Sequence, residues 1–333
     1  MTQAGHAFFQ LLLLIGAIMK RMKIPNYERI LTMIDEQQNG ILYTAGAYIL
    51  WGVLPIYWKL IQEISAFEIL AHRIIWSFVF MGAVVLLARK HKAFLAECRS
   101  IMKSKKQLIG ITLASLAISI NWVTYILAVN TNHVVEASLG YYINPLVSIL
   151  LGMIVLKEKF SRAQWLAFLL AVLGVSYMTM NFGSVPWLAL LLAFSFGSYG
   201  LLKKLVPLNA MFGLTIETLI VTPFALIFLV QQQTGHWSSV DWLSMTSVLV
   251  FGSGIVTAIP LLLFSAGAKR IPLSMVGFLQ YFAPTIMLII GVFLYEEPFT
   301  SVHVVSFTLI WAGLALYTVT RMKRLKKYEA KVS

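Results

Sequence analysis

The sequence predicts an all-α integral membrane protein with ten transmembrane helices, arranged as two inverted five-helix repeats. Three observations support this fold class: the composition, a series of apolar segments, and one segment that occurs twice. Of the 333 residues, 59% are hydrophobic and 12% are charged, and the mean hydropathy is +0.82. Soluble domains contain about 25% charged residues, so the composition excludes an ordinary soluble domain.

Ten apolar segments are each near the ~20 residues that a helix needs to cross the hydrocarbon core of a bilayer. They cover residues 43–60, 67–88, 108–128, 135–156, 163–180, 185–202, 210–230, 243–266, 272–295 and 301–320. Nearly all Lys and Arg residues lie at the termini or in alternate connections, and cytoplasmic loops collect these residues. The pattern predicts a multi-pass protein with both termini cytoplasmic. It also explains the net charge of +13 without nucleic acid as a partner.

One apolar segment occurs twice. Residues 140–161 read GYYINPLVSILLGMIVLKEKFS, and residues 279–300 read LQYFAPTIMLIIGVFLYEEPFT. Both copies place a tyrosine, a proline, a glycine and a final Glu-x-Phe at the same spacing. Such a repeat predicts a duplicated membrane domain, a plan that many secondary transporters share. Because each half contains five segments, an odd number, the two halves are expected to be inverted relative to each other in the membrane.

The predicted organisation has four parts. They are an N-terminal arm (1–40), a first repeat (41–181), a second repeat (182–322) and a basic cytoplasmic tail (323–333). The arm contains an apolar run, Ala7–Met19, that is too short to span a membrane. This run is either an interfacial helix or sequence that precedes a true translation start at Met33.

The first segment combines aromatic side chains with a proline. Pro55 predicts a break in the helix, which membrane helices tolerate where the freed backbone groups face protein or a wet cavity. Trp51 and Tyr57 are candidate substrate-binding residues. Trp58 and Lys59 follow at the end of the segment and are typical of an interfacial belt.

The second segment contains Arg73, about two turns inside the predicted helix and directly after His72. A central Arg in lipid costs at least ~2.5–3.5 kcal/mol on insertion scales, so Arg73 is expected to face the protein interior. It either forms a structural ion pair, selects a polar or anionic substrate, or snorkels to the surface. Glu136, at the outer end of the fourth segment, is its expected ion-pair partner in one state of the protein.

Further candidate substrate-binding residues lie in the third, fourth and ninth segments. They are Asn121, Trp122, Tyr125, Tyr141, Asn144, Gln280 and Tyr281. Asn121 and Tyr125 share one helix face because they are four residues apart, although Asn121 also suits interhelical hydrogen bonding. Further helix breaks are expected at Pro145, Pro260 and Pro284.

Proton coupling would require a titratable group inside the bundle. Glu136 and Glu217 are the first candidates and His72 is the third, while static ion pairing is the alternative role for both carboxylates. No cofactor or metal site is predicted, because Cys98 is the only cysteine and no His/Cys cluster is present. The absence of a phosphate loop and of any recognisable catalytic spacing indicates that the protein is not an enzyme.

Several runs resemble the RarD branch of the EamA, or drug/metabolite transporter, superfamily. They are EILAHRIIWS, NWVTYILAVN, EASLGYYINPL, FGSYGLLKK, ET (217–218), GIVTAIPLLLF and LQYFAPT, which together cover much of residues 40–320. The resemblance implies a ten-helix, inverted-repeat permease of the bacterial inner (plasma) membrane. It supplies no settled site residues, so the candidates above depend on physical reasoning.

The expected function is secondary-active transport, in the export direction, of a small polar or amphipathic metabolite or drug by alternating access. The expected partners are this small-molecule substrate and the lipid bilayer, with proton coupling as an option. The alternatives are a membrane-embedded lipid-modifying enzyme and a non-transporting membrane subunit.

Overall fold

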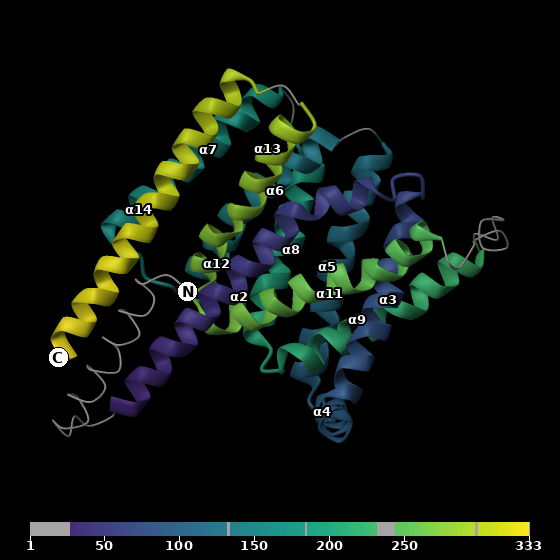
Figure 1. Ribbon diagram of the computed structural model, residues 1–333. Coiled ribbons are helices and arrows are strands. Elements are labelled where there is room, and N and C mark those ends of the chain that lie inside the picture. Colours follow the sequence, from purple (N-terminus) through teal and green to yellow (C-terminus); the bar gives the residue numbers. More distant parts are fainter. Residues whose placement is uncertain (1–26, 132–133, 184, 232–243, 297–298, 333) are drawn as a thin grey trace.

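The computed structural model describes residues 27–131, 134–183, 185–231, 244–296 and 299–332. Within these ranges, the side chains of residues 27–34, 126, 129–130, 134–137 and 321–332 are outside the description. The helices shown in Figure 1 are α2 (Tyr27–Lys59), α3 (Ala66–Leu87), α4 (His91–Lys103), α5 (Lys105–Asn130), α6 (Val134–Ile154), α7 (Arg162–Phe182), α8 (Trp187–Leu205), α9 (Ala210–Gln231), α11 (Met245–Arg270), α12 (Leu273–Gln280), α13 (Phe282–Leu294) and α14 (Ser301–Val332). The predicted all-α class is confirmed for these ranges, which contain no strand.

Nine helical segments in the described ranges are long and apolar enough to cross a membrane, with α12 and α13 counted together as Leu273–Leu294. The tenth predicted span corresponds to α6, whose described apolar part is shorter, Ser138–Ile154. Helix α6 as a whole has 21 residues, which is roughly 31 Å at 1.5 Å per residue and matches the thickness of the hydrocarbon core. Helices suit this setting because they satisfy their backbone groups internally.

The ends of the bundle differ from the predicted boundaries. Helix α2 begins at Tyr27, so part of the N-terminal arm (1–40) is a direct extension of the first span. Helix α14 likewise continues to Val332, through the basic tail. Neither extension contains a proline, and Gly40 is the only glycine in them. A single glycine does not end a helix, so α2 and α14 continue through their extensions. Residues 1–26, including the apolar run Ala7–Met19, lie outside the described residues.

The basic connection between the second and third spans forms a helix of its own, α4. Phe94 and Ile101 on this helix pack against Ile111 of α5 and Leu208, near the start of α9. The rest of α4 is largely exposed and carries basic residues. This amphipathic pattern places α4 against the end of the bundle rather than across the membrane.

The ninth span is divided at Tyr281 into α12 and α13. The division lies three residues before Pro284, whose missing N–H and bulky ring disturb the preceding turn. The assigned helices continue through Pro55, Pro145 and Pro260. Those three prolines therefore do not divide their helices, because one missing hydrogen bond leaves the neighbouring turns in place.

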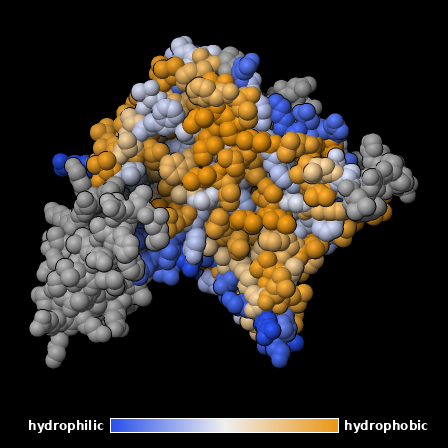
Figure 2. Space-filling model, viewed as in Figure 1, coloured by the Kyte–Doolittle hydropathy of each residue, from blue (hydrophilic) through white to orange (hydrophobic). Residues whose placement is uncertain are grey.

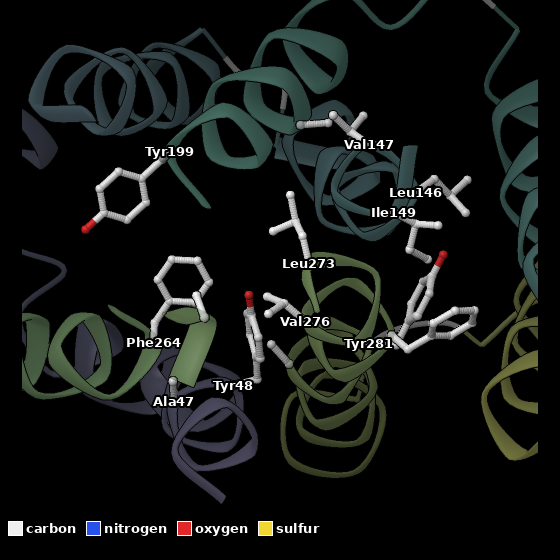
Figure 3. Close-up of a cluster of buried hydrophobic side chains, with 14 of the residues drawn as sticks. Ala47, Tyr48, Leu146, Val147, Ile149, Tyr199, Phe264, Leu273, Val276 and Tyr281 are labelled. Carbon is white, nitrogen blue, oxygen red and sulfur yellow. The ribbon is translucent and has the colours of Figure 1, made fainter. Parts of the chain in front are cut away.

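The main core lies where α2, α6, α8, α11 and α12 meet. Figure 3 shows Tyr199 and Phe264 on one side of Leu273 and Val276, and Tyr281 on the other side. The rings of Tyr199 and Phe264 stack with centroids 5.8 Å apart. Helix α6 packs extensively against α12 but makes at most sparse contact with α13. The fourth and ninth spans therefore meet along α12 and separate toward α13.

The outer surface of the bundle is apolar. Figure 2 shows a broad hydrophobic area over the middle of the visible face. Leu87, Met180 and Phe293 each expose more than four-fifths of their side-chain reference area, at 84%, 82% and 82%. Exposed side chains of this kind are stable in contact with lipid and costly in water. At one edge of the bundle, α7 and α14 lie side by side (Figure 1).

Glycines allow several helices to approach one another closely, which is typical of membrane bundles. A Cβ atom added at Gly254 would collide with the backbone of Trp76 and Ser77 on α3. Ser77 uses this proximity to donate a hydrogen bond of 3.0 Å to the carbonyl of Gly254. At Gly277 on α12, an added Cβ would lie 2.7 Å from the Pro145 carbonyl of α6.

We predict that Gly254→Ala destabilises the protein by about 1–3 kcal/mol, because α3 and α11 would have to separate. Gly82→Ala is the matched control, since a Cβ at Gly82 meets nothing within 4 Å. In a helix, Gly→Ala is otherwise favourable by up to about 1 kcal/mol. Thermal unfolding of the two purified variants tests the difference. Equal stability of both variants would contradict this account of the α3–α11 contact.

Candidate functional site

Arg73 is positioned by the start of α3. Ser65 precedes the helix, and its hydroxyl accepts a hydrogen bond of 3.3 Å from the backbone N–H of Glu68. This N-cap begins the helix at Ala66, so Arg73 lies about two turns inside the span. Arg73 is partly buried, and its Nε atom donates a hydrogen bond of 3.0 Å to Thr257 Oγ1 on α11.

Two indole rings flank the guanidinium group of Arg73. Its Cζ atom lies 4.6 Å from the ring centroid of Trp58 on α2 and 5.5 Å from that of Trp122 on α5. Both distances are within the range of cation–π attraction. The rings stabilise the charge electrostatically, but they do not neutralise it. Four helices thus converge on one cation.

Tyr125 and Tyr141 complete this cluster. Their ring centroids are 6.1 Å apart in an edge-to-face arrangement, and both side chains lie in the neighbourhood of Arg73. We define the Arg73 cluster as Arg73, Thr257, Trp58, Trp122, Tyr125 and Tyr141. All except the buried Thr257 are partly exposed, and the cluster brings together a cation, hydroxyl groups and aromatic faces.

A second polar group is fully buried between α8 and α9. The Lys203 Nζ atom lies 2.7 Å from Glu217 Oε1, and the Tyr199 hydroxyl donates a hydrogen bond of 3.0 Å to Glu217 Oε2. Each of the three side chains is at most 4% exposed. Charges buried to this extent persist when they are paired and hydrogen-bonded. Glu217 is therefore ion-paired and hydrogen-bonded in this conformation.

Glu158 occupies a third position, at the junction of α6 and α12. Its Oε1 atom accepts a hydrogen bond of 2.6 Å from the backbone N–H of Leu273, and Oε2 accepts one of 3.0 Å from Ser274. The carboxylate thus caps the first turn of α12, where free N–H groups and the helix dipole favour an anion. This cap ties the end of the first repeated segment to the start of the ninth span.

Other predicted site residues are not members of the Arg73 cluster, although the ring of Tyr57 lies edge-on to that of Trp58 with centroids 5.1 Å apart. Asn121 Nδ2 donates hydrogen bonds to the Leu192 carbonyl (2.9 Å) and to Ser195 Oγ (3.1 Å), and so joins α5 to α8. Trp51 packs against aromatic rings of the main core. The Tyr57 hydroxyl donates to the Leu249 carbonyl on α11.

The predicted residues of the broken ninth span are buried in the main core. Gln280 and Tyr281 are 3% and 1% exposed. Asn144 on α6 is also buried, and neither its Oδ1 atom nor the Tyr281 hydroxyl has a hydrogen-bond partner within the described ranges. His72, which directly precedes Arg73 in the sequence, is also buried. The side chain of Glu136 lies outside the described residues, and so does its predicted pairing with Arg73.

Sequence reasoning missed two members of the Arg73 cluster and two members of the buried ion-pair group. Trp58 was expected in an interfacial belt, yet its ring faces Arg73. Lys59 does lie over an aromatic ring, that of Tyr295 at 3.7 Å. The sequence did contain one sign that Trp58 faces the protein interior, because it is an aromatic residue three positions after the mid-helix Pro55. Nothing in the sequence indicated Thr257, Tyr199 or Lys203 as partners, because they approach from other helices.

The donor set is not that of a metal centre. Among the residues described, no group of three or more His, Cys, Asp or Glu side chains comes together in a way that could hold a metal ion. What the Arg73 cluster offers instead is hydrogen-bond donors on a cation, hydroxyl groups and aromatic surface. Groups of these kinds are the ones that fix small polar or amphipathic molecules in binding pockets.

Comparison with known proteins adds independent information. The sequence pattern of the EamA-like transporter family matches residues 38–180 and 184–319. The chain is 50% identical over 292 residues to "Uncharacterized transporter YojE" of Bacillus subtilis (strain 168), covering 86% of this chain and 96% of that protein. It is 42% identical over 295 residues to "Protein RarD" of Salmonella typhi, with coverages of 88% and 98%. A solved crystal structure with 18% identity has a TM-score of 0.64 and covers 84% of this chain and 98% of that one.

Proposed function

This chain belongs to the EamA-like transporter family, within its RarD branch, and we propose that it is a secondary-active exporter of a small polar or amphipathic metabolite or drug. The observation that carries the proposal is the Arg73 cluster. Helices α2, α3, α5 and α6 of the first half contribute to it, and α11 of the second half supplies Thr257. A site shared by two halves changes its access when the halves move, as alternating access requires.

The packing supports an inverted repeat as part of this proposal. Helix α2, the first span of one half, packs against α11 and α13 of the other half. Helix α8, the first span of the second half, packs against α5 and α6 of the first half. The third spans of the two halves are α5 and α11, and the fourth spans are α6 and the α12–α13 pair. In each half, therefore, the first span packs against the third and fourth spans of the other half. Such reciprocal packing is expected of two related halves with opposite orientation.

The proposed setting is the bacterial inner membrane, with both termini cytoplasmic. The bacterial relatives and the placement of Lys and Arg residues support this orientation. We also propose that the substrate leaves chemically unchanged, because the relatives are named transporters and the Arg73 cluster offers binding groups only. Nucleic acid has no part in this function.

Reconstitution into liposomes tests the proposal directly. Vesicles that contain the purified protein are loaded with a defined mixture of metabolites and antibiotics, and efflux is followed by mass spectrometry. We expect protein-dependent efflux of at least one compound, with its mass unchanged, over protein-free vesicles. A new product mass would support the lipid-modifying or other enzymatic alternative. The absence of any flux in either direction would contradict a transport function.

We propose that Glu217 couples transport to protons, because it is a carboxylate buried inside a span, and a conformation that separates it from Lys203 would favour its protonated form. Glu217→Gln keeps the shape of the side chain but cannot exchange a proton at neutral pH. Its efflux is therefore expected to lose the acceleration that a pH gradient gives the native protein. Glu63→Gln, at an exposed position between α2 and α3, is the control. Unchanged gradient dependence in Glu217→Gln would assign Glu217 to structure alone.

A further inference from the structure

The charge of Arg73 is not balanced within the described part of the chain. The two ion pairs found there are Lys203–Glu217 and Arg270–Glu36, and neither includes Arg73. Glu158 is committed to the first turn of α12. An uncompensated cation inside a membrane span is costly, so the Arg73 cluster is most stable when an anion joins it.

The geometry of the guanidinium group specifies how that anion would bind. Its Nε atom is already used by Thr257, and the two indole rings flank it. Within the described part of the chain, neither Nη atom donates a hydrogen bond. The edge formed by the two Nη atoms matches the spacing of two carboxylate oxygens, which it binds in a bidentate manner.

The surroundings of this edge narrow the class of ligand further. The cluster contains one cation, and Lys59, which follows Trp58 on α2, lies over the ring of Tyr295. A doubly charged phosphate ester would leave one negative charge without a partner, whereas a carboxylate would be neutralised. The rings of Trp58, Trp122, Tyr125 and Tyr141 provide apolar and aromatic surface beside the charge.

We therefore propose that the Arg73 cluster binds a monocarboxylate with an apolar or aromatic body, and that such organic acids are the transported substrates. This inference rests on the proposed transport function and assigns its substrate class. The carboxylate accepts two hydrogen bonds from the Nη edge of Arg73. The body of the acid packs against the tryptophan and tyrosine rings, and neutral or cationic analogues lack the charge that Arg73 requires.

Matched sets of compounds test the substrate class. Proteoliposomes are loaded with acids, their primary amides and the corresponding amines, built on the same bodies: benzoic, phenylacetic, indole-3-acetic and short aliphatic acids. Protein-free liposomes correct for passive leakage. We expect the acid of each transported set to leave at least about tenfold faster than its amide, since hydrogen bonds between charged partners contribute about 1.5–3 kcal/mol.

Variants of Arg73 connect the selectivity to the site. Arg73→Gln is expected to lower acid efflux by about tenfold to 100-fold, and Arg73→Lys to restore part of it, because lysine keeps the charge but not the bidentate edge. Arg99→Gln, on the exposed face of α4, is the matched control. Size-exclusion profiles verify that each variant is folded, and the selectivity of the native protein is informative without any variant.

The outcomes separate the two proposals. Transport of acids over amides, lost in Arg73→Gln, supports both. Transport of amides or amines without preference for acids overturns the carboxylate proposal and leaves the transport function standing. This second result is expected if Glu136 permanently neutralises Arg73. No protein-dependent flux of any compound contradicts the transport function itself.

Discussion

Lys203→Met is expected to destabilise the folded protein by about 3–5 kcal/mol, the usual cost of removing one partner of a buried ion pair. In the variant, the Glu217 carboxylate would remain buried and would still accept the hydrogen bond from the Tyr199 hydroxyl. The desolvation cost of that charge would no longer be offset by Lys203 at 2.7 Å. Denaturant titration in mixed micelles measures the difference in unfolding free energy.

The double variant Lys203→Met/Glu217→Leu is expected to recover most of the loss. Well-packed apolar residues often replace a buried ion pair without a net cost, although the Tyr199 hydroxyl would lose its acceptor, at about 1–3 kcal/mol. Lys106→Met, at an exposed position near the start of α5, controls for the loss of a lysine. If Lys203→Met were as stable as Lys106→Met, Lys203 and Glu217 would not be effectively paired.

Glu158→Ala is expected to loosen the contact between α6 and α12. The substitution removes the acceptor of two backbone N–H groups, at 2.6 and 3.0 Å. A partly buried donor that loses its partner costs about 1–3 kcal/mol. Because the cost applies only while α6 and α12 are packed together, the variant shifts the population toward conformations in which they separate. A shift of about 1.4 kcal/mol changes that population tenfold.

Cysteine labelling measures this separation. Ser274 is 3% exposed, so Ser274→Cys reacts with a maleimide only when α12 moves away from α6. Partial burial raises the pKa of the native Cys98 thiol, and Cys98→Ser removes this background. We expect Ser274→Cys to be labelled about tenfold faster when it is combined with Glu158→Ala than when Glu158 is present. The labelling rate with Glu158→Gln should lie between these two rates, because glutamine keeps one acceptor oxygen. An unchanged rate would show that the cap does not hold the two helices together.

The spans could be predicted from the sequence because lipid imposes a simple requirement. Each crossing needs a long apolar helix with internally satisfied backbone groups, and hydropathy alone identifies such segments. Helix α4 was not predicted, because its single apolar stripe is short and lies among the basic residues that mark topology. The extension of α2 to Tyr27 was missed for a similar reason: polarity marks the end of a span, whereas only a helix-breaking residue or a cap marks the end of a helix.

The candidate site was predictable only where one residue carried a large cost. The expense of a charge in lipid identified Arg73 and Glu217, and both are held by polar contacts inside the bundle. Their partners arrive from other helices, so neither helical periodicity nor local spacing could identify Thr257 or Tyr199. Lys203 belongs by sequence to the basic residues that set topology, and only the fold shows it beside Glu217.

The interlocking of the two halves has a consequence for synthesis. The chain enters the membrane from its N-terminus, so Arg73 is inserted long before Thr257, its hydrogen-bond acceptor on α11, has been made. Helices α5 and α6 lack their packing partner until α8 has been made, and α7 lacks its partner until α14 has been made. Biogenesis therefore cannot finish one half at a time. Assembly is completed only when the C-terminal helix reaches α7, and a chain released early leaves its polar groups in the bilayer without their partners.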